Sequence, residues 1–220
     1  MNRNRFLSVI GLSFLASLLS SARRKKDVQV ATDCNDPITP PVNEGPYYKD
    51  EKLNRADIRE SKQGVPITYV FLVEDKHCKP VEGAIVDIWQ CDADGRYSDF
   101  EAQQSLNQTW LRGYQKTDKK GECKFNSIFP GWYNGRLTHL HLKVHVNNSA
   151  VLTSNLFFPK HIEDEVYKAP LYPKGINTVT VAQDIELHGD KNESRFKALT
   201  MDITRDAQNK LIGKYKIALA

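Results

Sequence analysis

The feature that most constrains the fold of this chain is a series of short runs rich in β-branched and aromatic residues, with turn sequences between them. The runs span residues 67–73, 84–90, 122–128, 138–146, 151–158, 196–203 and 211–219. Turn signals such as Asp94-Gly95, Lys120-Gly121, Pro130-Gly131, Asn147-Asn148 and Asn209-Lys210 separate them. This spacing predicts an all-β fold, a β-sandwich with long loops. A short helical segment at residues 161–168 is the one exception we expect.

Length and charge narrow the classes of protein further. A chain of 220 residues that is 40% hydrophobic can bury one sizeable core, so we expect one folded domain. The formal net charge is +4, and the cluster at residues 23–26 contributes four positive charges by itself. Elsewhere basic and acidic residues alternate, which is not the basic face of a folded nucleic-acid-binding protein. No nucleic-acid partner is expected.

The first residues follow the pattern of an export signal. Arg3 and Arg5 precede an apolar run at residues 6–19, and small residues at 20–22 are suited to cleavage. The basic cluster that follows opposes translocation, so residues 1–22 are either a signal or an uncleaved anchor, and a membrane partner is expected only in the second case. Residues 23–44 are polar and proline-containing and predict a tether to a domain at 45–220. We therefore expect an exported protein, periplasmic or extracellular.

Four cysteines, Cys34, Cys78, Cys91 and Cys123, fit an oxidising compartment, and no CxxC motif is present. They are either disulfide-bonded or buried thiols. A bond between Cys78 and Cys91 is not expected, because the predicted strand between them rises by about 23 Å. Pairing of Cys34 with Cys78 or with Cys91 is preferred.

Two histidines on one predicted strand form a candidate metal site. Because side chains alternate along a strand, His139 and His141 project to one face with Cα atoms roughly 6.6 Å apart, and two imidazoles can share a metal ion. His145 lies on the same face but about 13 Å farther along. An incidental surface pair is the other interpretation of such a motif.

Two further segments place aromatic and charged residues near these histidines. Residues 130–136 deliver Tyr133 and Arg136 just before the strand, and residues 89–97 end in Tyr97. Each tyrosine alone is most often a packing residue. Together with Glu44-Gly45-Pro46-Tyr47-Tyr48, Arg112-Gly113 and Leu156-Phe157-Phe158-Pro159, the ordered motifs resemble the intradiol ring-cleavage dioxygenases, over roughly residues 33 to 205.

The resemblance implies a non-haem Fe(III) enzyme. The family's iron ligands, two tyrosines and two histidines, carry over to Tyr97, Tyr133, His139 and His141, and its catalytic arginine carries over to Arg136. Such an oxidoreductase incorporates both atoms of O2 into a catechol-type aromatic diol and opens its ring to a muconate-type dicarboxylate. Tyr133 would be catalytic as well, as the ligand that leaves when the diol binds.

The sequence also departs from the family pattern. Asn155 stands where the family usually has glutamine, and the helical dimerisation region of dedicated catechol dioxygenases is missing, as in the shorter exported members. Fe(III) is a hard cation that favours anionic oxygen ligands, so two tyrosines suit it. Two other functions stay open: an exported, non-catalytic β-sandwich binding module, and a zinc hydrolase that uses His139, His141 and His145.

Overall fold

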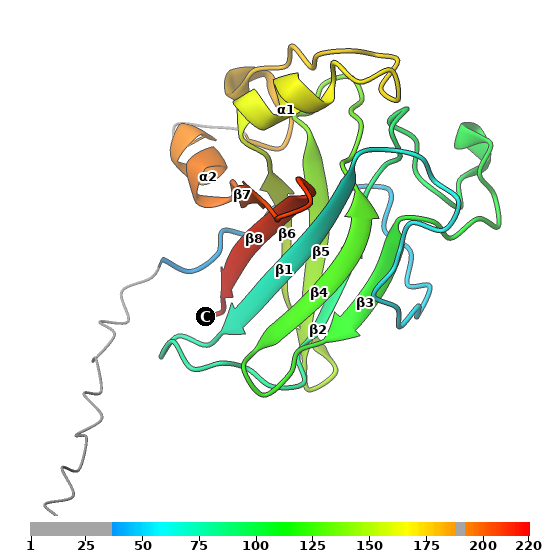
Figure 1. The fold of residues 1–220 in the computed structure, drawn as a ribbon. Helices are drawn as coiled ribbons and strands as arrows, with labels where there is room; N and C mark the ends of the chain where they lie inside the picture. The colour runs from blue at the N-terminus through cyan, green and yellow to red at the C-terminus, as the bar shows by residue number, and fades with distance from the viewer. Residues whose placement is uncertain (1–36, 188–191) are drawn as a thin grey trace, which may run out of the picture. The chain divides into compact units, whose positions relative to one another are not determined.

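Two four-stranded sheets form the body of the chain (Figure 1). The computed structural model describes residues 37–187 and 192–220. The first sheet has the order β4 (Glu122–Ile128), β1 (Pro66–Glu74), β8 (Leu211–Ala218) and β7 (Asp202–Arg205). The second has the order β3 (Arg112–Lys116), β2 (Ile85–Trp89), β5 (His139–Val146) and β6 (Ser149–Phe157). The prediction of an all-β sandwich is confirmed.

The core lies between the sheets and fixes which face each strand turns outward. β1 runs parallel to β8, and the other neighbouring strands are antiparallel. Along β1 every second residue is buried, and Tyr69 and Phe71 join the same core as Leu140 and Leu142. Since side chains alternate across a strand, the odd-numbered residues of β5, His139 and His141 among them, project away from this core.

One predicted strand is wrong. Residues 192–198 of the described chain form a helix, α2 (Asn192–Ala198), and the strand that follows is β7. Phe196 packs against Phe157 with ring centroids 5.4 Å apart, and Leu199 is fully buried. This spacing of three residues puts both side chains on one helical face, which alternation over a short apolar run cannot reveal. β3 was not predicted either, because its residues are mostly polar.

The expected helical segment is present as α1 (Lys160–Val166), which lies across the upper end of the sandwich in Figure 1. Its Ile162 and Val166 face the core, and Glu163 is only 3% exposed. Burial raises the pKa of Glu163 to about 8, because the Lys160 ammonium, 3.9 Å away, compensates only partly for the lost hydration.

This buried carboxyl predicts a pH-dependent stability. Folded Glu163 holds its proton up to about pH 8, whereas an unfolded glutamate releases it near 4.5, so its contribution to the free energy of unfolding is lost as the pH rises through that window. Glu163→Gln is expected to flatten the fall in stability between these values, and exposed Glu165→Gln serves as the control. Urea unfolding at several pH values measures it; equal slopes in both variants and the wild type would contradict the assignment.

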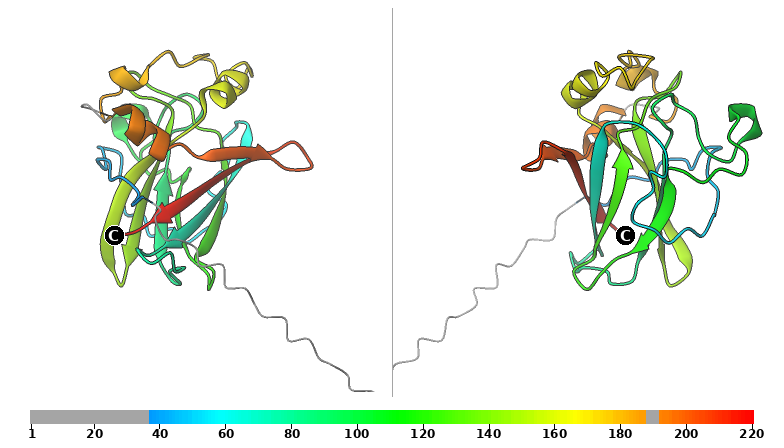
Figure 2. Two further views of the ribbon diagram at one scale, coloured as in Figure 1. Left: turned by 90° about the vertical axis from the view of Figure 1, so that its left-hand side faces the viewer. Right: turned by 45° about the vertical axis from the view of Figure 1, so that its right-hand side comes forward.

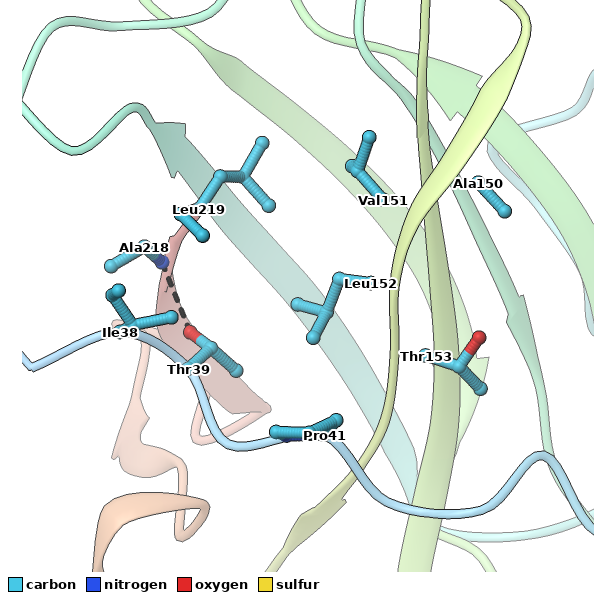
Figure 3. A pocket seen from close by; sticks show the side chains of 10 residues that line it. Ile38, Thr39, Pro41, Ala150, Val151, Leu152, Thr153, Ala218 and Leu219 are labelled. Atoms are coloured by element: carbon cyan, nitrogen blue, oxygen red, sulfur yellow. Dashed lines mark hydrogen bonds between the residues drawn. The ribbon is translucent and has the colours of Figure 1, made fainter.

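Part of the predicted tether belongs to the domain. Val42 is 6% exposed and its N–H donates to Thr153 O at 3.0 Å, and Thr39 exchanges hydrogen bonds with Ala218 at 3.0 Å. Figure 3 shows Thr39, Thr153 and Ala218 beside a groove of about 340 Å³ between residues 38–41, β6 and the C-terminus. Residues 37–44 therefore pack on the sandwich, which corrects the expected boundary at Gly45.

The predicted export segment, residues 1–22, and the first part of the predicted tether, residues 23–36, lie outside the described residues. Within residues 37–187 and 192–220, no helix is long and apolar enough to cross a membrane.

Cys78 is disulfide-bonded, whereas Cys91 and Cys123 are buried free thiols. The predicted absence of a Cys78–Cys91 bond is confirmed. The alternative pairing of Cys34 with Cys91 is wrong, because Cys91 is a free thiol, and the pairing of Cys34 with Cys78 stays a prediction.

Candidate metal centre

The centre lies on the outer face of β5, where loops cover the second sheet. Trp89 of β2 is opposite His141 in the register of the two strands, and the two rings stack with centroids 4.7 Å apart and an interplanar angle of 9°. A second cluster of buried aromatic residues, Trp89 and Tyr97 with Tyr47 and Tyr133 packed against it, encloses the histidines. Figure 2 shows the long loop between β2 and β3, which carries Tyr97, and the shorter one that leads into β5.

Two glycines allow the tyrosine-bearing loops to meet. Gly95 has φ of +78°, and a Cβ there would lie 2.2 Å from Trp132 O. A Cβ on Gly131 would lie 2.5 Å from Ala93 O. Only glycine permits such close approach of two backbones. The Asp94-Gly95 and Pro130-Gly131 turns thus do more than reverse the chain, since they bring Tyr97 and Tyr133 to the same side of β5.

The four predicted ligands converge. The Oη of Tyr97 lies 3.3 Å from His139 Nε2 and 3.0 Å from His141 Nε2. The Oη of Tyr133 lies 3.1 Å from His139 Nε2, and the two Nε2 atoms are 3.1 Å apart. Nitrogen and oxygen atoms that share one first-row metal ion at about 2.0–2.2 Å are themselves roughly 3 Å apart. The spacing of these four side chains therefore fits a single ion.

Burial sets the protonation of the four groups. It holds the pKa values of His139 and His141 well below the usual range, with Arg136 acting in the same direction, so both imidazoles are neutral and each has one unprotonated ring nitrogen. Burial also raises the pKa of Tyr97 well above its usual value and that of Tyr133 to about 12. A nearby cation is what could offset this cost and hold both phenols as tyrosinates.

His145 does not join this group. It pairs in register with Ile85, whereas His141 pairs with Trp89 at the other end of β2. In the described part of the chain no three His, Cys, Asp or Glu side chains gather where they could share a metal ion. The three-histidine zinc site that the sequence left open is not formed by these residues.

Arg136 is buried beside the histidines and is held by a carboxylate that the sequence analysis missed. Asp184 accepts from Arg136 Nε at 3.1 Å and from the backbone N–H of Leu137 at 2.7 Å. The same carboxylate accepts from the N–H of Glu186 at 2.9 Å. Asp184 thereby fastens the turn before β5, and no sequence motif distinguishes it from the chain's other acidic residues.

Buried polar contacts also fix the loops around the tyrosines. Arg112, 2% exposed, donates to Tyr47 O at 2.7 Å and to Ser98 O at 2.9 Å, so one side chain of β3 joins two loops. The ring of Tyr47 stacks on that of Tyr97 at 4.2 Å between centroids. The sequence pointed to these residues only as parts of larger motifs.

A buried site with two tyrosines and two histidines on a β-sandwich defines a class of metalloprotein, and comparison with known proteins agrees with it. The Dioxygenase family model matches residues 41–207, more than half of the chain. The chain belongs to the intradiol ring-cleavage dioxygenase family.

Individual relatives show how far the similarity extends. Catechol 1,2-dioxygenase 1 of Acinetobacter lwoffii is 27% identical over an alignment of 140 positions, and the match covers 58% of this chain and 45% of the relative. An intradiol ring-cleavage dioxygenase of Aspergillus niger is 27% identical over an alignment of 139 positions, and the match covers 60% of this chain and 41% of the relative. The chain thus spans less than half the length of these two curated relatives.

Solved structures match over more of their length. The intradiol ring-cleavage dioxygenase of Tetranychus urticae superimposes with a TM-score of 0.74 at 28% identity, covering 83% of this chain and 94% of that one. The dioxygenase domain of a dioxygenase carbohydrate-binding protein fusion from Streptomyces sp. SirexAA-E gives 0.62 at 29% identity, over 83% and 98%. The similarity therefore covers nearly the whole of both solved chains, the second of which is one domain of a fusion protein.

Proposed function

We propose that this chain is an exported Fe(III) enzyme that cleaves a catechol-type ring between its two hydroxyl-bearing carbons, with O2 as co-substrate and a muconate-type dicarboxylate as product. The observation that carries the proposal is the convergence of Tyr97, Tyr133, His139 and His141 on one point. The names of relatives, catechol 1,2-dioxygenase among them, support the substrate class.

The donor set suits Fe(III). Two phenolate oxygens are hard anionic ligands, and two neutral imidazoles complete a set of four protein ligands. When bound, Fe(III) would act as a Lewis acid that activates the diol toward O2. Tyr97 is fully buried and suits a permanent ligand, whereas Tyr133 is partly exposed and suits one that yields to the substrate.

The chain's own residues then handle charge and protons. Tyr133, once its oxygen is released, can accept one of the two protons that the diol loses on binding. Arg136 carries a permanent positive charge in a buried position next to His141, so it can stabilise negative charge that develops on the substrate as oxygen attacks. Trp89, stacked on His141, holds that imidazole in its orientation.

A non-catalytic binding module is the second candidate, and burial argues against it. A module that binds a partner through an aromatic platform needs those rings at its surface, whereas Trp89 is 1% exposed and Tyr97 is 0% exposed.

The proposal is tested by following the oxygen atoms. Purified protein incubated with catechol under ¹⁸O2 is expected to give a dicarboxylate that carries two labelled atoms, with one O2 consumed per ring opened; an anaerobic reaction is the control. Absence of O2 uptake with every catechol tried, or a ring-opened product without ¹⁸O, would refute the proposed function.

A further inference from the structure

Asn155 connects Arg136 to the predicted ligand His141. Arg136 Nη2 donates to Asn155 Oδ1 at 2.6 Å, and Asn155 Nδ2 lies 2.9 Å from His141 Nδ1. All three side chains are buried, with Asn155 at 0% exposed. Water therefore cannot easily replace either partner of the amide.

The chemistry of the guanidinium determines which way the amide points. Arginine has only donors, so the atom of Asn155 that faces it must be the oxygen. The amide nitrogen then faces His141 and can only donate. His141 Nδ1 must accept this hydrogen bond, which leaves the proton of the neutral ring on Nε2.

His139 has the opposite arrangement. Its Nδ1 lies 2.6 Å from the carbonyl oxygen of Leu137, which can only accept, so Nδ1 carries the proton and Nε2 presents a lone pair. This is the tautomer that a metal ligand needs. A metal at His141 Nε2 requires the same of His141, namely a proton on Nδ1, and that proton would oppose the N–H groups of Asn155.

We propose that Asn155 is a positioning residue whose amide turns over when His141 binds a metal through Nε2. Its oxygen then accepts from His141 Nδ1–H, and its nitrogen repels Arg136 Nη2. The proton that leaves Nε2 goes to solvent and one from solvent is taken up at Nδ1, so the ring stays neutral. A terminal torsion of asparagine permits both orientations. The inference rests on the proposed function, because it takes His141 as a ligand.

The consequence falls on Arg136. Asp184 continues to hold its Nε at 3.1 Å, so the guanidinium stays beside the site while its Nη2 end loses its partner. A released N–H of a buried guanidinium has a strong requirement for an anionic oxygen. Metal binding would thus leave an N–H of Arg136 free to donate to the oxygens of a bound catecholate. Asn155 would couple metal binding at His141 to substrate binding at Arg136.

Nuclear magnetic resonance tests this directly. Long-range ¹H–¹⁵N spectra of ¹⁵N-histidine protein distinguish the two tautomers, and Ga(III) is a diamagnetic stand-in for Fe(III). In metal-free protein His141 is expected to carry its proton on Nε2, and in Ga(III)-loaded protein on Nδ1, while His139 keeps its proton on Nδ1 throughout. The Asn155 side-chain amide signals should shift at the same time.

The outcomes separate this inference from the proposed function. If Ga(III) perturbs both imidazoles but His141 Nδ1 stays unprotonated, or if Nδ1 already carries the proton without metal, the role of Asn155 is wrong while the ligand set survives. If Ga(III) perturbs neither imidazole, the proposed function fails and the inference fails with it.

A substitution gives an independent readout. In Asn155→Asp both oxygens accept, so Arg136 and His141 Nδ1–H are satisfied together and no turn is needed. We expect the Nδ1–H tautomer before metal is added and Ga(III) binding about tenfold tighter or more, as for carboxylate–histidine pairs at metal sites. Asn126→Asp, on the exposed side of β4, makes the same chemical change elsewhere and should leave both unchanged. Weaker Ga(III) binding by folded Asn155→Asp would overturn the inference.

Discussion

Replacing His139 or His141 with alanine is expected to weaken iron binding by roughly a hundredfold or more, since even partners outside the ligand set contribute ten- to a hundredfold at metal sites. Each substitution removes one of the four proposed ligands, and the Nε2 atom of the remaining histidine is 3.1 Å from the one lost. Iron bound per chain after equilibration with a competing chelator measures the effect.

His145→Ala is the matched control for this experiment. It removes an imidazole from the same strand, but at the end of β5 that pairs with Ile85 rather than Trp89. Its iron content should equal that of the wild type. Full iron binding by His141→Ala, or loss of iron in His145→Ala, would contradict the ligand set.

Arg136→Ala is expected to keep iron while turnover of the best catechol falls at least about tenfold, as for other buried groups that stabilise developing charge. The guanidinium is not a ligand in our account. Because the substitution leaves Asp184 buried without its ion-pair partner, it also costs stability, and rates must be compared at a temperature where both proteins are folded.

Arg136→Lys separates the two effects. Lysine retains a positive charge near Asp184 but lacks the planar fork of donors, so stability should recover more than turnover does. Iron content, unfolding midpoint and kcat of the three proteins are measured together. Unchanged turnover in folded Arg136→Ala would remove this residue from the mechanism.

The sequence was sufficient for the sandwich because strand alternation and turn chemistry are local signals. Pro130-Gly131 and Asp94-Gly95 predicted turns. The alternation in residues 138–146 predicted that His139 and His141 lie on one face of a strand, as they do in β5. It failed at residues 196–203, where Phe196 and Leu199 pack with helical spacing. A run of that length carries too few residues to distinguish the two periods.

The residues of the candidate site were likewise predictable only in part. The resemblance carried by ordered motifs identified Tyr97, Tyr133, Arg136 and the two histidines, which the fold brings together. Asp184 could not be found, because it acts through contacts across 48 residues of sequence and has no local pattern. The polarity of Asn155 likewise follows only from knowing what lies on each side of its amide.

The measurement that tests the central claim most directly is metal content combined with the visible absorption spectrum of the purified protein, before and after catechol is added. Tyrosinate bound to Fe(III) donates electron density to the metal, so the resting protein should contain iron, be red to burgundy, and shift its band to longer wavelength with catechol. Tyr97→Phe with Tyr133→Phe should abolish the colour. A colourless, active protein that contains zinc, or a band that survives loss of both tyrosines, would contradict the account.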